Sequence, residues 1–156
     1  MSETQIVSAE REITVPAAEI FKLIADPARQ PQWDANDNLA HADQGQRIDH
    51  VGQRFTMELT NGQTRENHVT EFEEGRLIAW KPAEVGEEPP GHLWRWEIEP
   101  QDDVTALVRH TYDWSQLTDE DRFERARSVT QESLENSLAK LTELAEAVDA
   151  GAEVTD

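Results

Sequence analysis

The residues best suited to acid–base chemistry lie in one stretch, ALVRHTYDW, over residues 106–114. His110 and Tyr112 stand two positions apart, so a β-strand would place both on one face. Histidine titrates near neutral pH, and with a neighbouring tyrosine it can act as general acid or base on a β-hydroxy carbonyl. We therefore take His110 and Tyr112 as candidate catalytic residues. The alternative is that His110 is simply hydrogen-bonded or exposed.

The pattern of this stretch does not say which of its faces points inward. If the side that carries Leu107 is inward, Arg109 faces the interior and can bind a ligand carboxylate. If the opposite side is inward, His110 and Tyr112 face the interior instead. Arg109 can also pair across the outer face of the sheet with Glu97. Both orientations remain open from the sequence.

Other catalytic signatures are missing from the sequence. The five histidines show no i,i+3 or i,i+4 pairing and no H-E-x-x-H motif, and there is no cysteine. These are the spacings and ligands of zinc sites. There is also no glycine-rich phosphate loop and no G-x-S-x-G nucleophile elbow. We expect no metal and no cofactor.

The charge balance limits the classes of partner. The 156 residues include 33 acidic and 14 basic ones, for a formal net charge of −19. Such a chain repels phosphate backbones and anionic lipids, so we expect no nucleic-acid partner and no stable membrane association. No apolar run approaches the length of a membrane span, and the first residues lack the regions of a signal peptide. With no cysteine, a cytoplasmic location fits.

Most of the chain before residue 117 shows strand patterns. Two short helices are expected between Pro16 and Trp33, and Asn61-Gly62 is a strong hairpin signal. The signal over 34–52 is weak, with a short strand at 39–42, and 82–91 is expected to be a loop. The clearer strands are expected at 5–15, 53–60, 64–73, 76–81, 92–99 and 104–114. Strands linked by hairpins pair antiparallel.

The last third of the chain predicts one long amphipathic helix from Leu117 to Val148. Thr118 is a suitable N-cap, with Asp121 three residues later, and no Pro or Gly follows until Gly151. An unbroken helix of this span is about 45 Å long. Its apolar stripe needs a partner, and a curved antiparallel sheet is the simplest one. This predicts an α+β fold in a single domain over 1–150, with a flexible tail at 151–156.

The segment EREITVPAAEIFKLIADPARQPQW resembles the opening of the SRPBCC superfamily (START and birch-pollen-allergen-like proteins), and most closely its polyketide cyclase/dehydrase-like subgroup. The residues that match the pattern V-P-A-x-x-[IV]-[FW]-x-x-[IL]-x-[DN]-P and the following Trp are Val15, Pro16, Ala17, Ile20, Phe21, Ile24, Asp26, Pro27 and Trp33. The resemblance extends over about 6–148. It implies a helix-grip fold of about seven strands, with a cavity between sheet and C-terminal helix for lipids, sterols or aromatic polyketides.

The resemblance makes the aromatic residues candidates for the lining of such a cavity, although Trp94 and Trp96 fit plain core packing as well. The expected ligand-binding residues are Phe21, Trp33, Phe55, Met57, Trp80, Trp94, Trp96, Arg109, Leu134 and Leu138. Three functions follow. The first is binding of an apolar or aromatic small molecule, and the second is a cyclase/dehydratase-type enzyme that uses His110 or Tyr112. The third is a protein-interaction or chaperone-assisting module with little cavity.

Overall fold

The computed structural model of the protein describes residues 5–35 and 38–151. Within these residues the strands are β1 (Ile6–Ile13), β2 (Leu39–His41), β3 (Arg54–Leu59), β4 (Thr64–Glu73), β5 (Leu77–Glu84), β6 (Leu93–Asp102) and β7 (Thr105–Asp113). The helices are α1 (Ala17–Ala25), α2 (Gln30–Trp33), α3 (Phe123–Arg127) and α4 (Gln131–Asp149), with 3₁₀ turns η1 (Pro27–Arg29) and η2 (Glu120–Arg122). Apart from Gly151, the expected tail lies outside the described residues.

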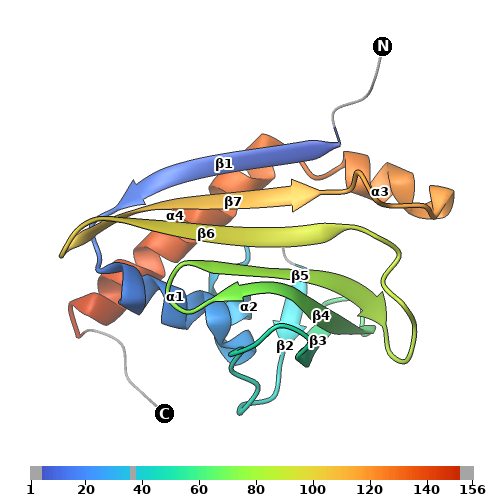
Figure 1. The fold of residues 1–156 in the computed structure, drawn as a ribbon, viewed down its shortest axis with the longest axis horizontal. Coiled ribbons are helices and arrows are strands. Elements are labelled where there is room, and N and C mark those ends of the chain that lie inside the picture. Colours follow the sequence, from blue (N-terminus) through green and yellow to red (C-terminus); the bar gives the residue numbers. More distant parts are fainter. Residues whose placement is uncertain (1–4, 36–37, 152–156) are drawn as a thin grey trace.

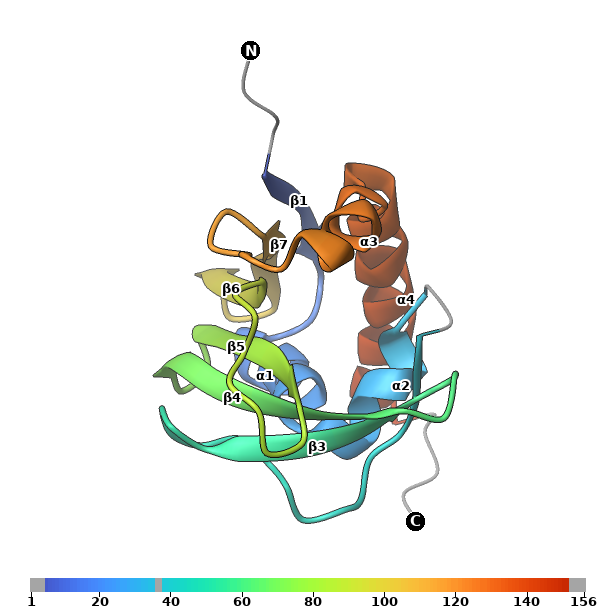
Figure 2. The same cartoon turned by 90° about the vertical axis from the view of Figure 1, so that its right-hand side faces the viewer.

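The described strands form one seven-stranded antiparallel sheet in the order β1-β7-β6-β5-β4-β3-β2. The sheet curves around α1, α2 and α4, which lie on one side of it (Figures 1 and 2). The predicted fold class is therefore confirmed: a curved antiparallel sheet, short helices after the first strand and a long helix at the C-terminal end. No helix in the described part of the chain is long and apolar enough to cross a membrane.

The main core lies between α4 and the face of the sheet that we call the inner face. Leu134, Leu138 and Leu141 of α4 are at most 1% exposed and belong to the same apolar cluster as Val108 of β7. Burial of each such leucine contributes on the order of 2 kcal/mol. Beyond β7, α4 reaches β1, where the Gln131 side chain donates to the Ser8 carbonyl at 3.2 Å. The helix thus anchors the β1–β7 side of the sheet.

The predicted single helix over 117–148 is wrong, because it is interrupted before α4. η2 and α3 form first, and α4 begins only after Thr130, whose backbone is extended. The 19 residues of α4 span about 28 Å rather than 45 Å. The helix start is also moved: Asp119, not Thr118, caps η2 by accepting from the Asp121 N–H at 3.1 Å.

The interruption has a local cause in the capping chemistry around Thr130. The Thr130 hydroxyl accepts from the Ser133 N–H at 3.2 Å, and the Ser133 hydroxyl accepts from the Thr130 N–H at 3.0 Å. This reciprocal pair is a capping box, which favours a helix start over helix continuation. The apolar spacing agrees, because Val129 and Leu134 are five residues apart. On an unbroken helix they would point roughly 140° apart.

β5 extends into the segment that was expected to be a loop, since Pro82 and Ala83 are buried strand residues. Proline is tolerated in a strand where its missing N–H faces no ladder partner. β5 pairs with β6 only from Leu77 to Trp80. Residues 81–84 of β5 therefore have no strand on the β6 side with which to form backbone hydrogen bonds. The loop is therefore shorter, and the two strands diverge after Trp80.

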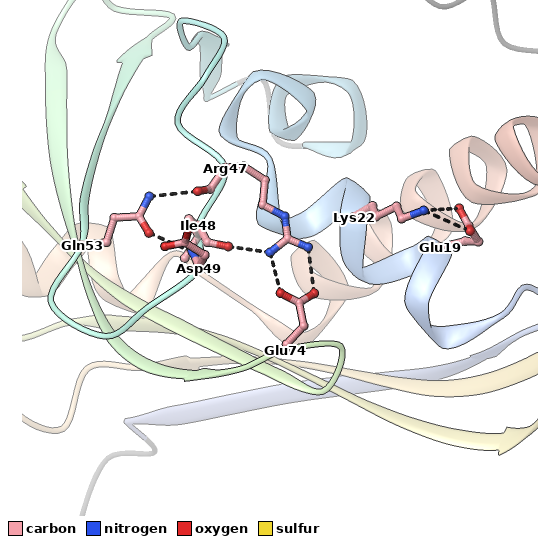
Figure 3. A network of polar contacts seen from close by, with 7 residues as sticks. All are labelled: Glu19, Lys22, Arg47, Ile48, Asp49, Gln53 and Glu74. Atoms are coloured by element: carbon pink, nitrogen blue, oxygen red, sulfur yellow. Dashed lines mark hydrogen bonds and ion pairs between the residues drawn. The ribbon is translucent and has the colours of Figure 1, made fainter.

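The weakly patterned segment before β3 is held by side chains (Figure 3). The Gln53 amide accepts from the Asp49 N–H at 2.8 Å and donates to the Arg47 carbonyl at 3.0 Å. The Arg47 guanidinium donates to the Ile48 carbonyl at 2.6 Å and to both oxygens of the Glu74 carboxylate at 2.9 and 2.8 Å. These long-range partners explain why local sequence pattern alone gave little signal here.

The capping box at the start of α4 generates a test of where this helix begins. Thr130→Ala should lower the free energy of unfolding by about 1 kcal/mol, because Ser133 loses its N-cap acceptor. Thr118→Ala, at the residue that the sequence suggested as cap, should change it by less than about 0.5 kcal/mol. Urea unfolding of both variants measures the difference. Equal losses would contradict a helix start at Thr130.

Candidate functional site

A cavity of about 370 Å³ lies between the inner face of the sheet and the helical segments beside it. The inner faces of β3 to β7 form one wall. The opposite wall comes from α2, η2, α3 and the first two turns of α4. Figure 2 shows α2, α3 and α4 on the side toward which the sheet curves. The cavity therefore lies beside α4 and extends from β7 across β6, β5 and β4 to β3.

Apart from Arg109, the sequence-predicted residues divide into two groups. Those that line the cavity are Trp33, Met57, Trp80, Trp94, Trp96, His110 and Tyr112. Phe21, Phe55, Leu134 and Leu138 lie instead in the main core, each at most 1% exposed, and do not line it. Phe21 packs edge-on against Phe72 at 5.9 Å and Phe55 against Trp80 at 5.4 Å, so neighbouring rings already cover both phenyl groups.

Arg109 lies on the outer face of the sheet, away from the cavity. Its guanidinium donates to the Glu10 carboxylate on β1 at 2.8 and 3.1 Å, and this partner holds the pKa of Arg109 above its usual value. The structure therefore places Arg109 away from the cavity in which a ligand contact was expected, and its hydrogen bonds go to Glu10, whereas the expected partner Glu97 acts on it only through its charge. The strand register places Glu10 and Glu97 on either side of Arg109, and the hydrogen bonds go to Glu10.

A stack of aromatic rings forms the wall that β6 and β7 contribute. Antiparallel pairing sets Trp96 opposite His110 and Trp94 opposite Tyr112. The imidazole of His110 is stacked on Trp96 at 3.7 Å and lies 5.5 Å from Trp94 between ring centroids. Trp94 reaches Tyr112 at 4.4 Å, and Trp33 meets Trp96 edge-on at 5.1 Å. This resolves the open orientation, because the His110 side of β7 points inward.

His110 and Tyr112 are both held in their neutral forms. Burial lowers the pKa of His110 to about 3, although a hydrogen bond with the Arg95 carbonyl works against that shift. That bond, 3.2 Å from Nδ1, places the proton of the neutral ring on Nδ1 and the lone pair on Nε2. Burial raises the pKa of Tyr112 to about 12, so its phenol stays protonated. At pH 7, Nε2 of His110 can therefore accept a hydrogen bond and the Tyr112 hydroxyl can donate one.

Three arginines also line the cavity, and we call them the arginine cluster: Arg65, Arg122 and Arg125. Arg65 comes from β4, where it shares the inner face with Asn67 and Val69. Arg122 ends η2, and Arg125 lies in α3. The alternation of Arg65 with Asn67 and Val69 was a readable signal, but the two helical arginines depend on the unexpected break before α4.

His92, which also lines the cavity, stands close to the arginine cluster. Burial, and then the positive charges of Arg122, Arg65 and Arg125, lower the pKa of His92 to about 4. Its Nδ1 is buried without a hydrogen-bond partner among the described residues. The preceding Gly91 has φ +128°, and a Cβ on it would lie 2.1 Å from the Gln116 carbonyl oxygen. Glycine therefore lets this loop pack against the turn that leads to η2.

The sequence interpretation missed most of the polar lining residues and several apolar ones. The lining residues not predicted are Gln30, Asp34, Asn38, Leu39, Leu59, Arg65, Asn67, Pro82, His92, Leu117, Arg122, Arg125, Ala126, Ser128, Val129, Ser133 and Ser137. Most lie in segments whose position depends on the moved start of α4 or on the weakly patterned region before β3. Among the described residues, no three His, Asp or Glu side chains are grouped to hold a metal ion.

The buried imidazole of His110 predicts how stability depends on pH. Above pH 6.5 both folded and unfolded chains carry it neutral, and below that pH only the unfolded chain takes up the proton. Between pH 7.5 and 5.0 the ring should therefore cost roughly 2 kcal/mol of unfolding free energy. His110→Phe should remove that part of the pH dependence.

The matched control is Trp94→Phe, which alters the same stack but removes no titrating group. Urea unfolding at pH 7.5 and 5.0 measures the change for the parent and both variants. Trp94→Phe should keep the pH dependence of the parent. If His110→Phe keeps it as well, the ring is not held neutral by burial.

Two curated proteins of Mycobacterium tuberculosis are similar to this chain in sequence. An uncharacterized protein of Mycobacterium tuberculosis strain H37Rv is 31% identical over 111 residues, which are 69% of this chain and 47% of that protein. A second, from strain CDC 1551 / Oshkosh, is 33% identical over 112 residues with the same coverage. This chain therefore spans about half the length of the curated relatives it matches.

Solved structures share the fold at low sequence identity. A protein from Mesorhizobium loti has a TM-score of 0.67 at 17% identity, covering 92% of this chain and 98% of that one. A Thalictrum norcoclaurine synthase in complex with a transition-state analogue has 0.59 at 11% identity, covering 92% and 94%. The Aha1 dimer from Colwellia psychrerythraea has 0.59 at 16% identity, covering 96% and 100%.

The family profile covers most of the sequence. Residues 4–146 match the family described as "Polyketide cyclase / dehydrase and lipid transport". That span contains the sheet, the short helices and most of α4. The protein therefore belongs to the polyketide cyclase/dehydrase and lipid transport family.

Proposed function

We propose that this protein binds an apolar or aromatic small molecule, lipid-like or polyketide-like, in the cavity between sheet and helices, without covalent chemistry. The proposal rests on the size and the lining of this cavity. A volume of about 370 Å³ falls in the range of small-molecule sites, and an aromatic wall with a few polar groups is their usual lining. The family description, which combines cyclases with lipid transport, supports an apolar ligand.

The aromatic stack gives a flat surface on which a ligand ring or chain can lie. Trp94 and Trp96 line the cavity next to His110, and ring–ring contacts contribute about 0.5–1.5 kcal/mol each beyond area burial. Met57 on the opposite part of the sheet adds an adaptable thioether. His110 Nε2 and the Tyr112 hydroxyl can orient a polar group of the ligand.

The chemistry of the site favours binding over the cyclase/dehydratase alternative. A general acid or base works best with a pKa near the operating pH. The pKa values of His110, about 3, and Tyr112, about 12, lie far from neutrality on opposite sides. Both residues therefore suit hydrogen bonding to a neutral ligand group. The third function, a protein-interaction module, predicts little or no cavity. A cavity of about 370 Å³ argues against it.

The test uses N-phenyl-1-naphthylamine, an uncharged aromatic probe. On addition to the protein its emission should rise and tryptophan emission should fall, because Trp94 and Trp96 line the cavity. Native mass spectrometry should show a one-to-one complex. Ala126→Phe, which places a ring in the cavity wall, should weaken binding of the probe at least tenfold.

The control is Ala40→Phe, the same substitution at an exposed position of β2 that does not line the cavity. It should bind the probe as the parent does. Circular dichroism and thermal melting check that both variants are folded, since overpacking at Ala126 costs about 1–3 kcal/mol. Absence of any response in the parent, or full binding by folded Ala126→Phe, would refute the proposal.

A further inference from the structure

The arginine cluster is unexpected in a chain with this charge. The protein has 14 basic residues against 33 acidic ones, yet three of those 14 line one cavity. Two of them come from the short segment between β7 and α4, and the third from β4, on the opposite wall. Plain solvation of an acidic surface does not explain why three positive charges, two of them partly buried, gather around one cavity.

Two of these arginines have neutral hydrogen-bond partners. Arg65 donates to the Gln63 amide oxygen at 3.0 Å, and Arg125 to the Asn38 amide oxygen at 3.0 Å. These side-chain hydrogen bonds of Arg65 and Arg125 go to amide oxygens and not to carboxylates. An amide oxygen orients a guanidinium without neutralising it. Two of the three positive charges are therefore positioned but not balanced by these contacts.

Arg122 is the arginine of the cluster with carboxylates at ion-pair distance, although Glu84 also lies opposite Arg65 in the β4–β5 register. It lies 3.8 Å from the Glu84 carboxylate and 3.2 Å from the Asp119 carboxylate, with 29% of its side chain exposed. Asp34, which also lines the cavity, accepts from the backbone N–H groups of Asn38 and Leu39 at 2.9 Å. The acidic groups at the site thus stand beside Arg122 or have backbone donors of their own.

The three charges are close enough to disfavour one another. Burial and then the charge of Arg122 lower the pKa of Arg65, with a smaller contribution from Arg125 and an opposing one from Glu84. Burial first, and then the same three cations, lower the pKa of His92 to about 4, so this ring is neutral at pH 7. Like charges held together in a partly buried site lose stability unless an anion joins them.

We propose that the arginine cluster binds the anionic group of an amphipathic organic anion, a carboxylate or a phosphate ester, whose apolar body lies on Trp94 and Trp96. This inference rests on the proposed function and names the chemical class of its ligand. Guanidinium groups bind such oxyanions through paired hydrogen bonds. The unpartnered Nδ1 of His92 adds one further polar atom at this end of the cavity.

The experiment compares two probes of one shape, 1-naphthaleneacetate and its uncharged amide, 1-naphthaleneacetamide. Titration calorimetry and tryptophan quenching measure both at pH 7.5 in 20 mM salt. The carboxylate should bind at least tenfold more tightly than the amide, as expected when a charge-assisted hydrogen bond replaces a neutral one. Raising the salt to 500 mM should reduce the advantage of the carboxylate and leave amide binding nearly unchanged. Naphthyl phosphate is titrated in the same way to test whether the cluster binds a phosphate ester.

Variants then separate the cluster from the general field of the protein. Arg65→Gln and Arg125→Gln should each weaken carboxylate binding five- to tenfold without changing amide binding. Arg11→Gln removes the same charge at an exposed position of β1 that does not line the cavity, and it should bind both probes as the parent does. Arg65→Gln should also melt no lower than the parent, because it relieves repulsion within the cluster.

The outcomes distinguish this inference from the proposed function. Equal affinity for carboxylate and amide would overturn the anion site while leaving apolar binding intact. Equal losses in Arg65→Gln and Arg11→Gln would overturn it too, because they would assign the effect to net charge. Binding of neither these two probes nor the phosphate ester, together with no response to N-phenyl-1-naphthylamine, would refute the proposed function itself.

Discussion

The structure depends on the packing of α4 against one side of the curved sheet. The apolar face of α4, with Leu134, Leu138 and Leu141, fills the space beside β1 and β7 and forms the main core. Among the strands, α4 packs mainly against β1 and then β7, at one side of the seven-stranded sheet. The remaining inner face must be covered by shorter segments, and these leave a cavity. The site is thus a consequence of how much of the sheet one helix can cover.

Two local features shape that cavity. The capping box at Thr130 ends the preceding helical segment, so η2 and α3 form a separate part of the cavity wall and bring Arg122 and Arg125 to it. On the sheet, β5 and β6 stay paired only as far as Trp80 and then diverge. The loop between them returns through Gly91, which lies against the backbone of Gln116. The site therefore opens where helical hydrogen bonding stops before Thr130 on one wall and where β5 and β6 stop pairing on the other.

The sequence predicted the large elements because their signals are local and repeated. Alternation along the strands, the Asn61-Gly62 turn and the apolar spacing of α4 give the sheet and the final helix. The aromatic wall was also predictable, since Trp94 and Trp96 share one strand face. The break before α4 was missed because Thr130 resembles any polar residue inside a helix. The orientation of β7 stayed open because both faces of that strand carry polar side chains.

The polar end of the site could not be predicted, since it is assembled from residues far apart in the chain. Arg65 and Arg125 are 60 residues apart, and only the fold brings them to one cavity. Sequence pattern gives each of them the appearance of a solvated surface arginine. Arg109, which stood beside the candidate catalytic residues, instead binds Glu10, 99 residues away on β1. Long-range pairing decides the role of each arginine.

The central claim is that the ligand enters the cavity between sheet and helices, and the tryptophans offer a direct measurement. Trp33, Trp80, Trp94 and Trp96 line the cavity, whereas Trp114 is buried against Phe123 outside it. Assigned indole N–H resonances in ¹⁵N-labelled protein should be followed during titration with 1-naphthaleneacetate. The account predicts saturable shifts at the four lining tryptophans that exceed any at Trp114. Shifts confined to Trp114, or equal small shifts at all five, would contradict it.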